Sequence, residues 1–153
     1  AYLYDVMVDT AKEVGRADDA AGLAAHRDTV LAALPELQPR AKTVLELIDL
    51  AQFIYAVRPI VPDAAAAALL TDDARALLAG IAETLGGLAD WSVPAIDAAM
   101  RQLAEEKGLK LGKLAQPLRA ALTGRTVSPG IFEVMVLIGR DEAMARLNDQ
   151  ARA

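Results

Sequence analysis

Residues 107–138 read KGLKLGKLAQPLRAALTGRTVSPGIFEVMVLI and contain the signals that decide how this part of the chain folds. Gly108 and Gly124 each follow a run of helix-forming residues, and a glycine in that place ends a helix. Pro117 fits only near the start of a helix, because a proline further inside removes a backbone hydrogen bond and clashes with the preceding turn. The stretch therefore predicts a connector at 110–113, followed by a helix that ends at Gly124.

A second helix is predicted in the same stretch. Ser128 and Pro129 supply an N-cap followed by a proline at the first helical position. The helix would then cover the apolar residues 131–137. Residues 134–138, VMVLI, could form a strand on propensity alone. The cap in front of them and the lack of a partner strand favour a helix.

The rest of the chain continues this helical pattern, with apolar residues three or four positions apart. Asp63, Thr71 and Ser92 are each placed to cap the helix that follows them. No alternating stretch is bounded by hairpin turns, and no repeat of about 20–50 residues occurs, which argues against a sheet or a solenoid. We expect further helices within 2–14, 23–34, 39–53, 64–70, 72–85, 93–107 and 141–151.

The predicted fold class is all-α, with two packed helical lobes. Prolines and a short alanine run interrupt the pattern at about 59–72, which gives lobes over 1–62 and 63–153. Hydrophobic residues make up 54% of the chain and aromatic residues only 4%, so Leu, Ala, Val and Ile must build the core. No uncharged run approaches the roughly 18 residues that a membrane span needs, so no membrane partner is expected.

The distribution of charge matters more than its total. The net charge of −5 by itself argues against binding a polyanion such as RNA. Residues 1–100, however, carry 7 basic and 15 acidic side chains, whereas residues 101–153 carry 9 basic and 6 acidic ones. The interval 107–125 holds five basic residues and no carboxylate: Lys107, Lys110, Lys113, Arg119 and Arg125. This basic stripe is either a solvated helix face or a surface that binds an anion.

Candidate catalytic groups are few. The absence of cysteine excludes disulfides, thiolate metal sites and a cysteine nucleophile. His26 is the only histidine, and its alanine and charged neighbours are typical of a surface position. No zinc-protease, Walker or dinucleotide-binding fingerprint occurs, and Gly86-Gly87 is more simply a helix stop than a phosphate loop. We expect no catalysis by this chain alone, and no metal or cofactor bound to it.

The motifs within 107–138 resemble the end of bacterial-type glutamyl-tRNA synthetases. The order and spacing of four segments carry the resemblance: KLGK at 110–113, QPLR at 116–119, LTG at 122–124 and SPGIFE at 128–133. PRAKTVLEL at 39–47 and Asp90-Trp91 are also similar to family segments, whereas 1–38 has no distinctive motif. The alanine-rich composition is similar to that of alphaproteobacterial members.

The resemblance implies the anticodon-binding domain of a class I aminoacyl-tRNA synthetase, in which two helical lobes bind the anticodon loop of glutamate tRNA in the cytoplasm. A separate N-terminal catalytic domain would attach glutamate to that tRNA for protein biosynthesis, using ATP and magnesium. The catalytic signatures of that domain, of the types His-Ile-Gly-His and Lys-Met-Ser-Lys-Ser, do not occur in this sequence. Since the sequence also begins with Ala1 and not Met, we expect a piece of a longer ligase.

The resemblance also implies roles for individual residues. Arg119 matches an arginine that contacts the first anticodon base, and Ser128, Pro129 and Ile131 match the loop and helix start that contact the middle uracil. Arg40, in a shorter motif, is the candidate for the third base. These residue types suit unstacked bases, because a guanidinium can donate to the acceptors of cytosine and a helix start exposes N–H groups. Three further residues are possible contacts to tRNA phosphates: Lys110, Lys113 and Arg125.

Two alternatives remain open at this stage. One is a free-standing helical interaction or regulatory module that kept the fold and lost RNA binding, which the acidic first hundred residues permit. The other is a small helical enzyme that uses His26, and no other residue supports this alternative. Single residues also have structural interpretations: Arg119 as an ion-pair residue, Ser128 as a helix cap and Trp91 as part of the core.

Overall fold

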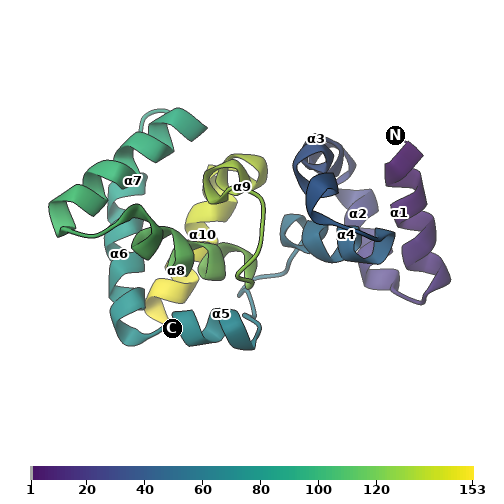
Figure 1. Cartoon of the computed structure of the whole chain (residues 1–153), viewed down its shortest axis with the longest axis horizontal. Coiled ribbons are helices and arrows are strands. Elements are labelled where there is room, and N and C mark those ends of the chain that lie inside the picture. The colour runs from purple at the N-terminus through teal and green to yellow at the C-terminus, as the bar shows by residue number, and fades with distance from the viewer. Residues whose placement is uncertain (1) are drawn as a thin grey trace. The chain divides into compact units, whose positions relative to one another are not determined.

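The computed structural model describes residues 2–153, which form ten α-helices and two short 3-10 helices (Figure 1). Within this range no strand occurs, so the all-α prediction is confirmed, including the choice of helix at 134–138. No helix among the described residues is long and apolar enough to cross a membrane. The chain divides into two compact units: unit 1 extends to Ala56, and unit 2 comprises Val57–Ala153.

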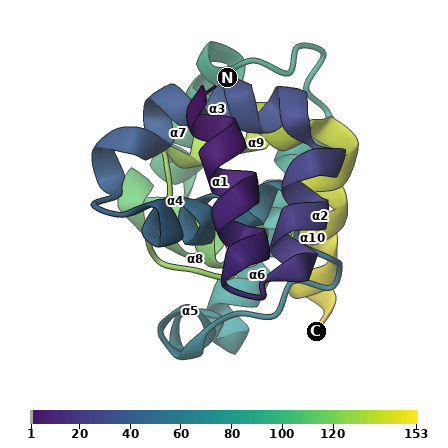
Figure 2. The ribbon, with the colours of Figure 1, turned by 90° about the vertical axis from the view of Figure 1, so that its right-hand side faces the viewer.

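Unit 1 is a small helical bundle. Its elements are α1 (Tyr2–Glu13), α2 (Ala17–Ala25), α3 (Arg27–Leu37), η1 (Gln38–Arg40), α4 (Val44–Ala51) and η2 (Gln52–Ile54). Helix α1 packs along α2 and against α4, and the three helices can be followed by their labels in Figure 2. Most of the core side chains are small or aliphatic, as the composition predicts, and those with no exposed surface are Met7, Ala11, Leu23, Val30, Leu37, Ile48 and Ala51.

A polar cluster around Asp19 joins α2 to η2 and α4. The carboxylate of Asp19 accepts hydrogen bonds from the Tyr55 hydroxyl (2.7 Å), the Gln52 amide (3.1 Å) and Arg16 Nε (2.7 Å). Arg16 also donates to Asp49 at 2.7 Å. Burial raises the pKa of Asp19, but the three hydrogen bonds lower it, and the net shift of the pKa is downward. Asp19 is therefore a charged anchor within unit 1.

Unit 2 is a larger bundle built around α8 and α10. Its helices are α5 (Ala64–Leu69), α6 (Asp72–Gly86), α7 (Val93–Lys107), α8 (Leu111–Thr123), α9 (Ile131–Ile138) and α10 (Arg140–Arg152). Helix α10 packs along α6 and also contacts α8 and α9, while α8 touches α5, α6 and α7 (Figure 1). The larger buried apolar side chains are Leu78, Ile81, Leu85, Ile96, Met100, Leu114, Leu118, Val134, Met135 and Leu147.

Five predicted helix boundaries are confirmed. The side chains of Asp63, Thr71 and Ser92 each accept a hydrogen bond from the backbone N–H three residues later, at 2.8, 3.1 and 3.3 Å. Gly108 and Gly124 end α7 and α8 with φ angles of 66° and 72°. Glycine populates this left-handed region without the steric penalty of a side chain. Local capping signals thus set five of the helix ends in unit 2.

The predicted start of α8 is wrong. Residues 110–113 do not form a connector, because α8 begins at Leu111 and Pro117 lies inside the helix. Pro117 is buried beside Leu114 and Leu118, which have no exposed surface. The apolar packing of this face offsets the backbone hydrogen bond that proline cannot make. Tertiary packing here overrides the local preference of proline for a helix start.

The predicted cap of α9 is also wrong. The helix begins at Ile131 with Gly130 at the N-cap position, so Ser128 lies two residues before the cap and Pro129 lies outside the helix. The hydroxyl of Ser128 is used by two groups outside the helix, as described below. A capping residue is recognised from sequence by its type, and serine at this spacing fits a loop role equally well.

Two boundaries in unit 1 differ as well. The single helix expected over 23–34 is two helices that meet at His26, since one non-helical residue hardly disturbs the apolar period. Pro39 begins no long helix and lies in η1. Helix α4 starts later, after Thr43, whose hydroxyl accepts from the N–H of Glu46 at 3.1 Å. A Thr-x-x-Glu capping signal in the sequence marked this start.

The segment 57–63 enters unit 2 along α10 and the end of α8. The backbone N–H of Asp63 donates to the carbonyl of Gly124 at 2.8 Å. The buried amide of Gln150, in α10, donates to the carbonyl of Ile60 at 2.8 Å. The second bond satisfies the carbonyl of the buried Ile60, in an extended segment that has no secondary structure of its own. The segment is therefore part of the packed structure of unit 2.

Candidate functional site

The structure brings together Arg119 and Ser128, two of the residues predicted to contact the anticodon. Arg119 lies near the end of α8, and Ser128 lies in the loop that leads to α9. Arg119 Nε donates to Ser128 Oγ at 2.9 Å, and the Ser128 hydroxyl donates to the carbonyl of Pro129 at 2.7 Å. Arg119 is half-buried, whereas Ser128 is only 9% exposed. The pair links the helix to the loop directly.

The end of α8 is fixed by Thr123, a residue whose role the sequence analysis missed. Its hydroxyl lies 2.8 Å from the carbonyl of Arg119 and accepts from the backbone N–H of Arg125 at 3.1 Å. Thr123 is 8% exposed. A threonine in the last turn of an apolar helix, bonding to the carbonyl four residues earlier, was the available signal. Thr123 thereby holds the backbone of Arg119 and begins the loop toward Ser128.

At the start of α9, the side chains of the predicted contact residues Pro129 and Ile131 are buried. Pro129 is buried, and the Ile131 side chain is 4% exposed, so it packs inside unit 2. The first N–H groups of the helix have no partner within the helix. Glu133 lies in this first turn, and its carboxylate is so close to Gly130 that a side chain there would overlap it. A carboxylate in this place repels a phosphate, so the helix start suits the carbonyl of a base better.

The basic stripe begins at Lys107, the last residue of α7, and continues at the N-terminal end of α8. Lys110 occupies the N-cap position, Lys113 lies in the first turn, and both are exposed. The first turn contains no acidic residue. Cations at this end oppose the helix dipole and therefore do not stabilise the helix. An anionic partner would balance this charge. Arg125, the last residue of the basic stripe, is half-buried and lies just beyond the other end of α8.

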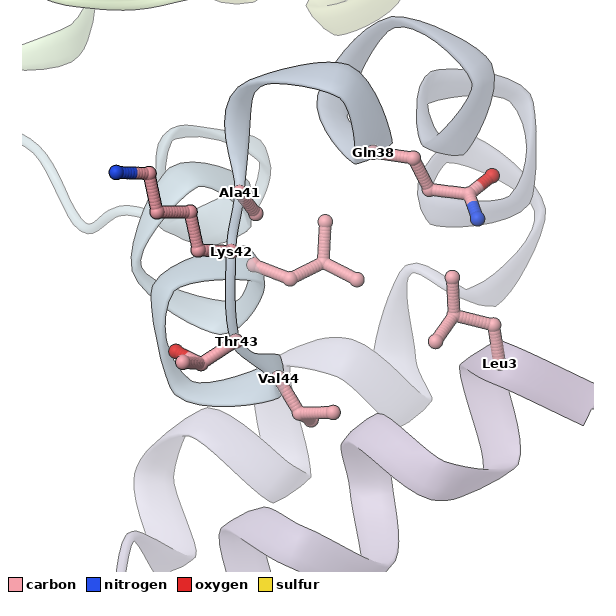
Figure 3. A pocket seen from close by; sticks show the side chains of 7 residues that line it. Leu3, Gln38, Ala41, Lys42, Thr43 and Val44 are labelled. Carbon is pink, nitrogen blue, oxygen red and sulfur yellow. The ribbon is translucent and has the colours of Figure 1, made fainter.

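Arg40 belongs to unit 1 and is held by the end of α3. Its Nη1 donates to the carbonyl of Glu36 at 2.7 Å and lies 3.9 Å from the Glu36 carboxylate. The side chain is exposed and projects from η1. The next residues line a hollow of about 210 Å³ (Figure 3). Its lining comprises Leu3, Gln38, Ala41, Lys42, Thr43, Val44 and Leu47.

Two other residues that the sequence singled out have structural partners. Trp91 is half-buried, its indole N–H donates to the carbonyl of Met135 at 3.0 Å, and the guanidinium of Arg140 lies 5.1 Å from the ring centre. His26 is exposed, with Nδ1 3.1 Å from the carbonyl of Gly22. Among residues 2–153 no group of three or more His, Cys, Asp or Glu side chains could hold a metal ion.

Comparison with known proteins identifies this arrangement of helices. Residues 7–151 match the family described as the anticodon binding domain, so the chain belongs to that family. Curated relatives include a glutamate–tRNA ligase of Bradyrhizobium (strain ORS 278), 57% identical over 84% of this chain, and glutamate–tRNA ligase 1 of Brucella melitensis, 49% identical over 94%. The chain spans 27% and 29% of the lengths of these two relatives. The resemblance carried by residues 107–138 is confirmed.

A solved structure agrees with the fold. The glutamate tRNA ligase from Elizabethkingia meningosepticum, solved in complex with its amino acid, superposes on 99% of this chain with a TM-score of 0.75. The chain covers 30% of that structure, and the sequence identity is 24%, so the match supports the arrangement of helices alone. Curated relatives come mostly from alphaproteobacteria, as the alanine-rich composition suggested.

Proposed function

We propose that this chain binds the anticodon loop of glutamate tRNA, as the anticodon-binding part of a glutamate–tRNA ligase. The observation that carries the proposal is the match to curated ligases at 49–57% identity over most of the chain. In the parent protein, a catalytic domain outside this chain supplies ATP and magnesium chemistry in the cytoplasm. The relatives named above are ligases, which favours this function over a free-standing regulatory module.

Each of the three anticodon bases is assigned to one or a few residues. Arg119 donates to the first base, because a guanidinium suits the acceptors on a pyrimidine edge. The loop formed by Ser128 and Pro129 and the first N–H groups of α9 at Ile131 surround the middle uracil. Arg40, on unit 1, contacts the third base. The close association of Arg119 with Ser128 supports a shared site for the first two bases.

Arg119→Ala is expected to weaken binding of the cognate anticodon stem-loop by about 1–3 kcal/mol and to relax discrimination at the first anticodon base. The reason is the loss of the only contact assigned to that base. Binding is measured by fluorescence anisotropy with the cognate stem-loop and one whose first base is a purine. Arg101→Ala, which removes an exposed arginine paired with Asp97, is the charge-matched control. Equal discrimination by the wild type and Arg119→Ala would refute the assignment.

Lys113→Ala is expected to weaken binding of cognate and altered stem-loops equally and to lower the slope of log K against log salt by under one unit. Lysine contacts to phosphate release counterions without reading sequence. Titrations at several salt concentrations measure the slope. Lys12→Ala removes an exposed lysine of unit 1, outside the basic stripe, and should leave the slope as it is. Identical slopes for both variants would identify Lys113 as an ordinary solvated side chain.

A further inference from the structure

The hydroxyl of Ser128 makes two hydrogen bonds inside the protein. Arg119 Nε lies 2.9 Å from Ser128 Oγ, and the carbonyl oxygen of Pro129 lies 2.7 Å from it. The polarity of both bonds is fixed, because an arginine Nε can only donate and a carbonyl oxygen can only accept. A serine hydroxyl has one hydrogen. That hydrogen points to Pro129, and one lone pair faces Arg119.

This arrangement leaves Ser128 poorly suited to donate to a base. Donation to a uracil carbonyl would require the hydroxyl to give up its bond to Pro129. Ser128 is 9% exposed and Pro129 is buried, so the abandoned carbonyl would lie in a poorly solvated place. Losing the partner of a buried polar group is costly. The hydroxyl is therefore better suited to hold Arg119 than to donate a hydrogen bond to the RNA.

We propose that Ser128 is a positioning residue for Arg119, and this inference rests on the proposed role of Arg119 in anticodon binding. Hydrogen bonds to Thr123 and Ser128 help to hold the arginine before RNA arrives. The Thr123 hydroxyl, 2.8 Å from the Arg119 carbonyl, holds the backbone, and Ser128 holds Nε near the far end of the side chain. Fixing the backbone and Nε restricts the plane of the guanidinium and the direction of its terminal nitrogens.

This arrangement favours binding because the Arg119 side chain is already ordered before the RNA binds. An arginine side chain has many rotamers, and immobilising it at an interface weakens binding unless it is ordered beforehand. The orientation also matters for specificity, since a guanidinium that swings freely can donate to a wrong base. Ser128→Ala should therefore weaken cognate binding about three- to tenfold and reduce discrimination at the base that Arg119 contacts.

A double-mutant cycle on the 153-residue chain tests the inference. Ser128→Ala, Arg119→Ala and the double variant are titrated with the cognate stem-loop and with one altered at the first anticodon base. We expect Ser128→Ala to weaken binding only when Arg119 is present, with less than about a twofold effect in the Arg119→Ala background. Ser128→Thr, which keeps the hydroxyl, should restore binding and discrimination.

The outcomes separate the two proposals. If Arg119→Ala changes neither affinity nor discrimination, the proposed function of Arg119 fails. If Arg119→Ala weakens binding but Ser128→Ala weakens it equally in both backgrounds, Ser128 acts independently of Arg119 and the positioning role is overturned.

A measurement without RNA gives an independent answer. In the free chain, the Arg119 Nε–H resonance should exchange slowly with solvent in the wild type and in Ser128→Thr. In Ser128→Ala it should exchange faster and shift, because the acceptor at 2.9 Å is gone. Circular dichroism of the three proteins checks that the helices persist. An unchanged Nε–H exchange rate in Ser128→Ala would contradict the hydrogen bond on which the inference depends.

Discussion

Gly124→Ala is expected to destabilise unit 2 by about 2–4 kcal/mol, for two separate reasons. The residue has a φ of 72°, a region in which a Cβ atom clashes with the backbone. A Cβ at this position would also lie 2.9 Å from the carbonyl oxygen of Val61 and 3.0 Å from Cγ2 of Ile60. Backbone atoms cannot move aside as the end of a flexible side chain can. Urea denaturation followed by tryptophan fluorescence measures the effect, since Trp91 is the only tryptophan and belongs to unit 2.

Gly108→Ala is the matched control for this variant. Gly108 also ends a helix with a positive φ, 66°, but a Cβ atom there would meet nothing within 4 Å. Its substitution should cause only the backbone strain of the left-handed region, about 1–2 kcal/mol. The difference between the two variants measures the close approach of residues 60–62 to the end of α8. If both variants lose the same stability, that approach contributes nothing.

Arg146→Ala is expected to destabilise unit 2 by about 3–5 kcal/mol. The Arg146 side chain is 1% exposed, donates to the carbonyl of Leu122 at 2.9 Å and contacts the carboxylate of Glu142 at 3.0 Å. Leu122 lies in the last turn of α8, where carbonyls lack partners within the helix and a cation is favourable. Burial lowers the pKa of Arg146, and Glu142 offsets part of that change. Alanine would leave both a cavity and an unpaired carbonyl.

Arg146→Met separates these two contributions. Methionine fills much of the buried space but donates no hydrogen bond to Leu122. We expect it to lose about 1–3 kcal/mol, the cost of an unpaired buried acceptor, as measured by urea denaturation of the same protein. If Arg146→Met were as stable as the wild type, the stabilisation would come from packing alone, and Arg146 would not cap α8.

Local signals in the sequence predicted most of the helices and failed where packing decides. Asp63, Thr71 and Ser92 cap helices because their side chains bond to backbone groups three residues away, which needs no tertiary contact. Pro117, in contrast, lies inside α8 because its buried face belongs to the core. Ser128 is a capping residue by type, but its hydroxyl accepts a hydrogen bond from Arg119, nine residues earlier in the chain. Such partners depend on the path of the loop.

The sequence proposed residues for the candidate site but not the contacts between them. The resemblance named Arg119 and Ser128 as separate contacts, and only the structure gives the 2.9 Å bond between them. Thr123 escaped notice because a hydroxyl near a helix end has many ordinary roles. Ile131 was predicted as part of the helix start that contacts the middle base, and because its side chain is only 4% exposed, its backbone is the group that remains available. Exposure of a single apolar residue at a helix start depends on packing that a local pattern does not encode.

The anchoring of segment 57–63 has a consequence for cutting the protein into independently folding pieces. A piece of unit 2 that began at Asp63 would lack the Ile60 carbonyl that satisfies the buried amide of Gln150. It would also lack Arg58, which forms two hydrogen bonds with Asp149 on α10. A piece that begins at Val57 keeps all of these partners. The extended segment, despite having no helix of its own, thus determines the shortest sequence from which unit 2 can assemble completely.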